Sequence, residues 1–273
     1  FDLNRTAAPV AWGRGRWPNV HWTNGSLIWC GSDADEAVVW RSVSQFGPAA
    51  FRIEGTAQPA GDRAWLSDTL GIDAGVPTFD DERLRVLLER HAGMRPFAHG
   101  SLWEGLAGSI VGQGVSVAGG ATLLSRIAAL VHPGVALAGR TLWPLPEPAE
   151  IAALGADRLR GVGLTRQRAE ALAAAATAMR DGALSKTDPL AFRDAAMAIR
   201  GIGRWTIEST LLWGVGDADI HPSGDIALLR AARHVFADPA LTMRGLDEMS
   251  ERWRPYRSWA ARLLWLELLG PAA

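Results

Sequence analysis

The 273-residue sequence has one cysteine, one lysine and almost no net charge. Cys30 alone cannot form an internal disulfide, and it cannot supply the thiolates of an iron–sulfur cluster. We therefore expect no cofactor and a reducing compartment, the cytoplasm. The net charge of −1 provides no general basic field, so any contact with a polyanion must come from local patches.

Long hydrophobic runs are also absent. Residues 1–9 show no apolar stretch behind a basic cluster, and no later segment reaches the roughly 18 apolar residues of a membrane helix. We expect neither export nor membrane insertion. With 48% hydrophobic residues, a chain of this length can bury a core and fold as a soluble protein.

Short extended segments occupy the region between residues 20 and 60. Residues 26–30, 37–43 and 50–54 read as antiparallel strands separated by glycine-containing turns. From about residue 80 onward, amphipathic helices follow one another without further strands. We predict an α+β fold with a β-rich N-terminal accessory domain over 1–85 and a large all-helical body over 86–273.

Capping residues place several helix starts. Ser101 and Glu104 match a capping box, which predicts a helix over 101–112 that is broken at Gln113–Gly114. Three further N-cap residues predict helix starts at Ser116, Thr165 and Asp188.

Two short segments resemble each other: Leu159-Arg-Gly-Val-Gly-Leu-Thr165 and Ile199-Arg-Gly-Ile-Gly-Arg-Trp-Thr206. Each predicts a helix, a Gly-x-Gly turn and a second helix. In the second copy, glycine amides beside a helix N-terminus can bind a phosphate, while Ile202 points inward between the helices. The alternative is a plain interhelical turn, and the copy at 161–163 fits that alternative.

A loop containing Asp217 and Asp219 follows the second hairpin and ends at Asp225, where a helix over 226–235 is expected. Asp217 and Asp219 fit a solvated loop or a turn. Asp225 fits an N-cap, which needs no catalytic role to explain it.

The segment Gly201-Ile-Gly-Arg-Trp-Thr206, with Asp225 further along, resembles the helix-hairpin-helix/Gly-Pro-Asp signature of DNA glycosylases. Residues 110–117, 164–170 and 253–259 resemble one branch, the bacterial 3-methyladenine DNA glycosylase II (AlkA-type) enzymes. Together these segments cover about 100–268. The β-rich N-terminus agrees with the family's accessory lobe in general character only.

The resemblance implies a role for each matching position. It makes Asp225 the catalytic carboxylate. It assigns DNA-backbone binding to Gly201, Ile202, Gly203 and Thr206, a DNA-facing turn to Gln113 and Gly114, and a base pocket to Trp205, Trp265, Ser209 and Ile226. Core packing is the alternative for the two tryptophans, and Arg257 fits a brace for the last helix.

Three positions depart from the family's pattern. Gly114 stands where the family inserts an apolar wedge into the duplex, and Ser209 and Ile226 stand where the best-known members have tyrosines. These differences put the range of excised bases in doubt, but they leave the catalytic carboxylate in place.

The function implied by the resemblance is monofunctional excision of alkylated bases from double-stranded DNA, by a monomer. Bifunctional relatives attack with a lysine at the position that Trp205 holds here, and the sole lysine, Lys186, lies in a polar loop. Bond cleavage requires no metal, although the carbonyls of 201–203 are a candidate site for a monovalent cation that helps to meet a phosphate.

Two alternatives stay open. The first is a glycosylase for oxidised or deaminated bases, against which Trp265 and the 253–259 segment favour the alkylation branch. The second is a non-catalytic DNA-binding protein that uses the hairpin alone, and the presence of Asp225 argues against it.

Overall fold

The computed structural model describes residues 1–32 and 37–272. Two short helices, α1 (Leu3–Thr6) and α2 (Ala8–Trp12), precede a four-stranded antiparallel sheet of order β1-β2-β3-β4. Its strands are β1 (Val20–Thr23), β2 (Ser26–Ser32), β3 (Val38–Gly47) and β4 (Ala50–Gly55). The turn between β1 and β2 is Asn24–Gly25, both with positive φ, as a tight hairpin requires.

One face of the sheet is buried because apolar residues alternate along its strands. Leu27 and Val43 face each other across the β2–β3 ladder and are fully buried. They pack with Leu3 of α1 and with Leu70 of α3 (Asp62–Leu70), a helix that follows the 3₁₀ turn Pro59–Gly61. The predicted β-rich N-terminal lobe is confirmed.

The rest of the chain is a helical body. Its helices are α4 (Glu82–Arg90), α5 (Leu102–Gly112), α6 (Val117–Val131), α7 (Pro148–Gly161), α8 (Arg166–Arg180), α9 (Pro189–Ala196), α10 (Arg204–Val215), α11 (Ile226–Val235), α12 (Met243–Ser250) and α13 (Arg257–Leu269), with a 3₁₀ turn at Glu251–Trp253. The predicted α+β class is thereby confirmed. Within the described residues no single helix could cross a membrane by length and composition, whereas α5 and α6, bent by 116°, pass that test only together.

The predicted caps form with one exception. Ser101, Ser116, Thr165 and Asp188 each accept a hydrogen bond from a backbone amide in the first turn of their helix. The second half of the capping box is wrong, because the Glu104 carboxylate accepts from Asn19 Nδ2 at 2.8 Å. Glu104 therefore ties α5 to the N-terminal lobe.

A hairpin inside the helical body was not expected. Strands β5 (Val135–Leu137) and β6 (Arg140–Leu142) pair with each other, and Leu142 packs on Ile28 and Cys30 of the N-terminal sheet. The prediction that strands end near residue 80 is wrong here, because three-residue strands leave too short a pattern to read.

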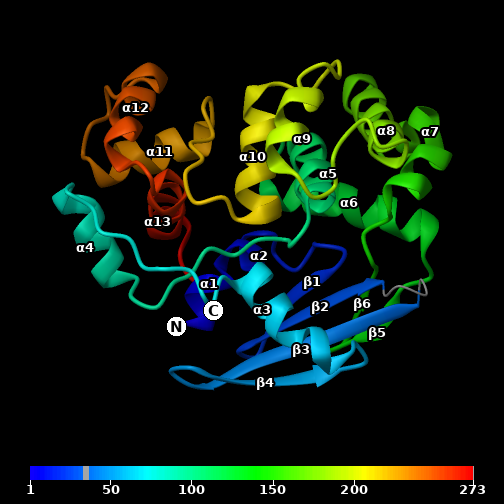
Figure 1. The fold of residues 1–273 in the computed structure, drawn as a ribbon, viewed down its shortest axis with the longest axis horizontal. Helices are drawn as coiled ribbons and strands as arrows, with labels where there is room; N and C mark the ends of the chain where they lie inside the picture. The colour runs from blue at the N-terminus through cyan, green and yellow to red at the C-terminus, as the bar shows by residue number, and fades with distance from the viewer. Residues whose placement is uncertain (33–36, 273) are drawn as a thin grey trace.

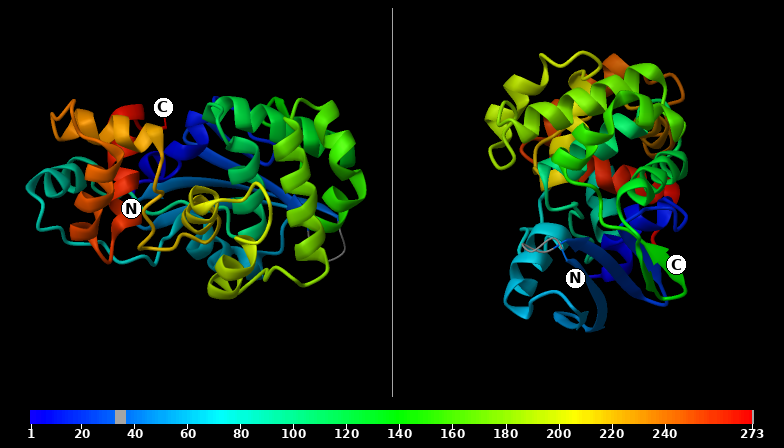
Figure 2. Two further views of the ribbon diagram at one scale, coloured as in Figure 1. Left: turned by 90° about the horizontal axis from the view of Figure 1, so that it is seen from above. Right: turned by 90° about the vertical axis from the view of Figure 1, so that its right-hand side faces the viewer.

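The sheet lies beneath the helical body, with α11, α12 and α13 on one side and α6, α7 and α8 on the other (Figure 1, Figure 2). Helices α5 and α10 pack closely where Gly105 meets Gly214. A Cβ added at Gly105 would lie 2.6 Å from the Gly214 Cα, so only glycine fits. This contact lies at the C-terminal end of α10, a helix that also borders a cavity between the two lobes.

Candidate active site

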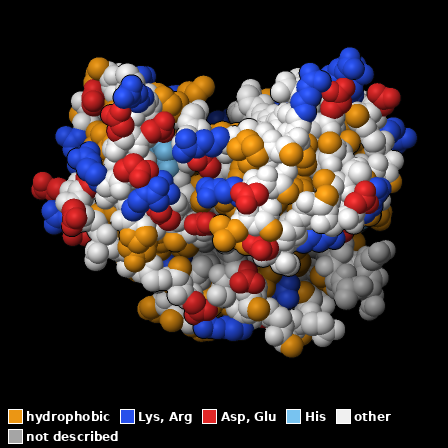
Figure 3. All heavy atoms as spheres, turned by 45° about the horizontal axis from the view of Figure 1, so that its top comes forward, with side chains coloured by type: hydrophobic (Ala, Val, Ile, Leu, Met, Phe, Trp, Pro, Cys, Tyr) orange, Lys and Arg blue, Asp and Glu red, His pale blue; other side chains and the backbone are white. Residues whose placement is uncertain are grey.

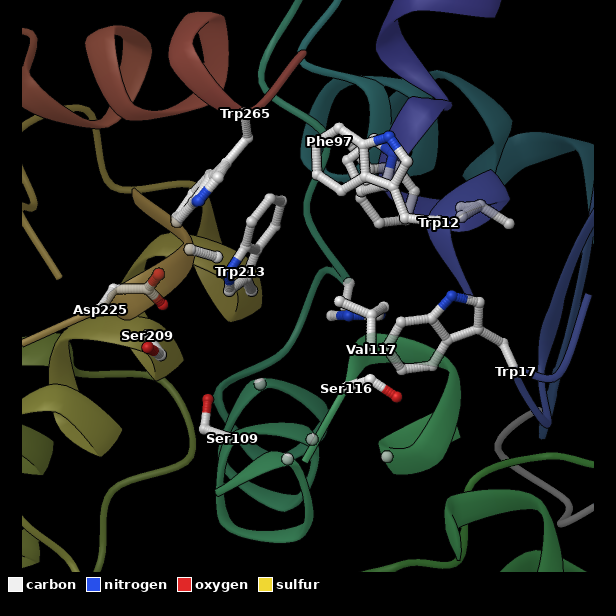
Figure 4. A pocket seen from close by; sticks show the side chains of 18 of the residues that line it. Trp12, Trp17, Phe97, Ser109, Ser116, Val117, Ser209, Trp213, Asp225 and Trp265 are labelled. Atoms are coloured by element: carbon white, nitrogen blue, oxygen red, sulfur yellow. The ribbon is translucent and has the colours of Figure 1, made fainter. Parts of the chain in front are cut away.

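Helix α10 presents one face to a cavity of about 280 Å³. Trp205, Ser209 and Trp213 recur at intervals of four residues along this face, and all three line the cavity. Asp225 and Trp265 complete the same wall from α11 and α13 (Figure 4). The structure therefore brings together four residues that the sequence assigned to the catalytic or base-binding site, and it adds Trp213.

Asp225 is both an N-cap and a cavity residue. Its Oδ1 accepts the Leu228 amide at 2.7 Å, and its Oδ2 accepts from Trp205 Nε1 at 3.1 Å. The two hydrogen bonds fix the carboxylate in one orientation. The N-cap interpretation of Asp225 is thus confirmed, and the same carboxylate lines the cavity.

The loop that leads to Asp225 is tied to α10. Buried Glu208 accepts the Ser223 amide at 2.8 Å and pairs with Arg204 at 2.8 Å. Since Arg204 directly follows the Gly201–Gly203 turn, one chain of contacts links the hairpin to the loop before the catalytic candidate.

The same loop is also held from α13. Arg257 pairs with Asp219 at 2.8 Å, which confirms its predicted role as a brace. Asp219 is thus ion-paired rather than part of a solvated loop, whereas Asp217 forms a turn by accepting the Asp219 amide at 2.9 Å.

The indole rings of Trp213 and Trp265 form a stacked pair. Their centroids are 5.3 Å apart with an interplanar angle of 27°. The Arg262 guanidinium lies 4.5 Å from the Trp213 ring centroid and donates to Leu212 O at 2.8 Å. Burial lowers the pKa of Arg262 to about 9. The pair therefore forms a rigid aromatic surface backed by a buried cation.

The N-terminal lobe supplies the opposite wall, which sequence reasoning missed. Trp12 and Trp17 line the cavity from this side, together with Phe97 and His99 from the segment between α4 and α5. Burial, and secondarily the charge of Arg262, lower the pKa of His99 to about 4, so its ring is neutral near neutral pH. No residue of the sequence signature reaches this wall, and nothing in the local pattern of residues 1–20 indicates a cavity.

The second hairpin leaves backbone amides free. Gly201 has φ +92°, whereas Gly203 has φ −111° and is itself the N-cap of α10, without a side-chain cap. Within the described residues, the amides of Gly203, Arg204 and Trp205 make no hydrogen bond. Ile202 is 5% exposed and points inward as expected. The turn can thus offer amides to an anion, although only one of its glycines needs positive φ.

The Thr206 side chain is not free to contact DNA, so any backbone contact there would use its amide. The residue is 2% exposed, and its Oγ1 accepts from Gln113 Nε2 at 2.9 Å. The same Nε2 donates to Gly201 O at 2.9 Å. Gln113 therefore holds the turn after α5 against the hairpin, and its side-chain amide is directed at the hairpin.

The tip of this turn is open. Gly114 has φ +67°, and an added Cβ would meet nothing within 4 Å. Val115 and Val117 beside it are 39% and 42% exposed and line the cavity. The exposed apolar side chains of this turn are therefore Val115 and Val117, beside Gly114.

Ile226 does not belong to the pocket. It is 71% exposed and does not line the cavity, whereas Ala227 does. As the first residue of α11, directly after the cap, Ile226 lies outside the face that Asp225 and Ala227 present to the cavity.

The described residues offer no group of three or more His, Cys, Asp or Glu side chains that could hold a metal ion. Lys186 is exposed and lies outside the cavity lining. On the face drawn in Figure 3, basic and acidic side chains are interspersed, so anion contact there depends on local donors.

No protein-family model matches the chain. The putative DNA-3-methyladenine glycosylase YfjP of Bacillus subtilis (strain 168) is 29% identical over 194 residues, covering 68% of this chain and 66% of the relative. DNA-3-methyladenine glycosylase 2 of Escherichia coli (strain K12) is 32% identical over 166 residues, covering 58% and 54%. The chain thus spans between about half and two thirds of these relatives.

Solved structures share the fold. The 3-methyladenine DNA glycosylase from Archaeoglobus fulgidus superposes with a TM-score of 0.76 at 22% identity, covering 97% of this chain and 91% of that one. A Schizosaccharomyces pombe 3-methyladenine DNA glycosylase in complex with abasic DNA gives 0.56 at 22% identity, covering 68% and 91%. The chain therefore has the helix-hairpin-helix DNA glycosylase fold, and its resemblance to the AlkA-like branch is confirmed.

Proposed function

We propose that this protein is a monofunctional DNA glycosylase that hydrolyses the N-glycosidic bond of alkylated bases such as 3-methyladenine and 7-methylguanine. The observation that carries the proposal is the Asp225 carboxylate, oriented by Leu228 and Trp205 at the edge of an aromatic cavity. The names of the similar proteins support alkylated rather than oxidised or deaminated bases. Asp225 also makes a purely DNA-binding role less suitable.

DNA enters this proposal through the hairpin. A target base inside a duplex must be extruded before its glycosidic bond can be reached. The free amides of Gly203, Arg204 and Trp205 can hold a backbone phosphate at the start of α10, where the helix dipole favours an anion. Because Trp205 also donates to Asp225, a hydrogen bond joins the phosphate anchor at the start of α10 to the carboxylate at the start of α11.

Bond cleavage builds positive charge on the sugar. A fixed carboxylate in a water-poor site stabilises that charge better than one in bulk water. Asp225 is placed for this role and for orienting the attacking water. Lys186 lies outside the cavity, so no amine is available there to attack the sugar and form an imine.

The extruded base would lie against the Trp213–Trp265 pair. An alkylated purine such as 7-methylguanine is cationic, and its attraction to an indole face contributes about 0.5–2 kcal/mol. The Ser209 hydroxyl lines the same wall and has no hydrogen-bond partner among the described residues, so it can bond a base edge. A site of this kind suits cationic bases, whose glycosidic bond is already weakened.

The test is base release from alkylated duplex DNA, with the freed bases identified by mass spectrometry. Asp225→Asn should lower single-turnover release at least about a hundredfold, because the charge partner of the transition state is lost. Binding to abasic-site DNA should persist. Asp217→Asn, a change in the same loop outside the cavity, serves as the control.

Two results would contradict the proposal: equal release rates for Asp225→Asn and the parent, or a borohydride-trapped adduct on Lys186. We further propose that the protein acts as a monomer on cytoplasmic DNA, which sedimentation and fractionation can check.

A further inference from the structure

The cavity has two walls of different character. The first, from α10, α11 and α13, carries Asp225, Trp205 and the Trp213–Trp265 pair. The second, the N-terminal wall, carries Trp12 and Trp17 of the N-terminal lobe and Phe97 of the segment between α4 and α5. Figure 4 shows the labelled side chains of these two walls on opposite sides of one space.

The second wall is apolar, uncharged and held in place. Trp12 Nε1 donates to Gly270 O at 3.0 Å, which fixes the indole. His99 contacts Trp17 and Phe97 edge to face, with centroid distances of 5.9 Å and 5.6 Å, and its lowered pKa keeps it neutral. A ligand reaching this wall would meet aromatic surface and no charge.

The floor between the walls is kept open by glycine. Gly108 and Gly112 lie within α5 and line the cavity, and an added Cβ at either would meet nothing within 4 Å. Packing therefore does not require glycine there. Glycine inside a helix lowers the stability of the helix by roughly 0.5–1 kcal/mol relative to alanine. The two glycines therefore destabilise α5 but leave the cavity free of side chains at these positions.

We propose, resting on the glycosylase activity above, that the N-terminal wall is a second subsite for an apolar substituent carried by the excised base. Asp225 must lie beside the sugar, so the base itself occupies the first wall. A methyl group leaves the second wall empty, whereas an aryl group on the purine reaches it. The substrate class therefore includes cationic purines enlarged by an aromatic group.

The experiment compares 7-benzylguanine with 7-methylguanine in matched duplexes, because the two bases share a cationic ring and differ in substituent size. Single-turnover rates are corrected for spontaneous release. The parent should excise the benzylated base within about tenfold of the methylated one. Gly108→Ala and Gly108→Leu should lower the benzyl-to-methyl rate ratio in order of side-chain size, the leucine variant by tenfold or more.

Gly161→Leu is the matched control. Gly161 lies in α7, outside the cavity lining, and its added Cβ would also meet nothing within 4 Å. This variant should leave the rate ratio unchanged. Thermal unfolding of each variant separates a filled subsite from a disturbed fold.

Binding of the free bases provides a readout that does not need catalysis. The parent should bind free 7-benzylguanine more tightly than 7-methylguanine, and Gly108→Leu should abolish the difference. Release of the methylated base without the benzylated one, or a rate ratio unchanged in Gly108→Leu, would overturn the subsite and leave the glycosylase proposal intact. Failure to release either base would overturn the glycosylase proposal, while a binding preference lost in Gly108→Leu would still support the subsite.

Discussion

The two Gly-x-Gly turns of this chain share the same glycines, but the helix that follows each turn begins in a different way. In the first, the Gly163 amide donates to Arg160 O at 2.9 Å, and Thr165 caps α8 by accepting the Arg168 amide at 3.4 Å. In the second, Gly203 is itself the N-cap of α10, and no side chain caps that helix. Helix α10 therefore begins two residues earlier relative to its turn than α8 does.

This difference is why we assign a structural role to the first turn and propose the second as the phosphate-binding turn. The first amides of any helix lack intrahelical partners, and a side chain or a ligand must satisfy them. Thr165 supplies such a partner within the chain, whereas the start of α10 leaves its amides for an external anion. The sequence repeat alone does not reveal this, because both copies share the same glycines.

Gly203→Val, in the second turn, is expected to have the largest effect on DNA binding. Gly203 has φ −111° and open space around an added Cβ, so the fold should tolerate valine. The side chain would instead occupy the space through which a phosphate approaches. We expect affinity for lesion and undamaged DNA to fall together by about ten- to hundredfold, or roughly 1.4–2.8 kcal/mol.

Fluorescence anisotropy at fixed salt measures this change, with thermal unfolding as the control for folding. Loss of lesion binding alone, with binding to undamaged DNA retained, would show that the turn does not contact the DNA backbone.

Gly163→Val should produce the opposite pattern. Gly163 has φ +110°, which side chains rarely adopt, and its Cβ would lie 3.2 Å from Leu123 Cδ2. The free energy of unfolding should fall by about 1–2 kcal/mol. DNA affinity per folded molecule should stay unchanged, as denaturant titration and anisotropy together can establish. A large loss of affinity would make the two turns functionally equivalent.

Local rules predicted much of this fold. The helix starts at Ser101, Ser116, Thr165 and Asp188 followed from cap chemistry, since a cap bond joins residues two or three positions apart. Trp213 could also have been found, because it repeats the spacing of Trp205 and Ser209 on α10.

The errors arose where tertiary packing decides. Thr206 matches the family's hairpin position, but its buried hydroxyl accepts a hydrogen bond from Gln113, which is far away in the sequence. Ile226 follows the catalytic candidate directly, yet the helix turns it to solvent. Trp12 and Trp17 reach the cavity only because the N-terminal lobe folds back on the helical body, a contact that no local pattern carries.

Gln113→Ala tests how the second turn is held. The variant removes the hydrogen bonds from Nε2 to Gly201 O and Thr206 Oγ1. Each such bond contributes about 1 kcal/mol, and the loosened turn should weaken DNA binding by roughly fivefold. Anisotropy should show this loss on lesion and undamaged DNA alike. Unchanged affinity would mean that the turn keeps its shape without these hydrogen bonds.

The smallest effect is expected from Thr165→Ala, which removes the side-chain cap of α8 after the first turn. Removal of a threonine cap costs about 0.5–2 kcal/mol of stability. Because this hydrogen bond is long, at 3.4 Å, we expect a loss near the lower end. Thr165→Ser should restore stability because serine keeps the hydroxyl. The uncapped amides of α8 would then resemble those of α10, yet Gly163 still donates its amide to Arg160 O, and Arg126 still donates to Val162 O at 3.2 Å. We therefore expect neither the DNA affinity nor its dependence on salt to change. A gain in affinity for Thr165→Ala would show that a missing cap alone is enough to create a phosphate site in this fold.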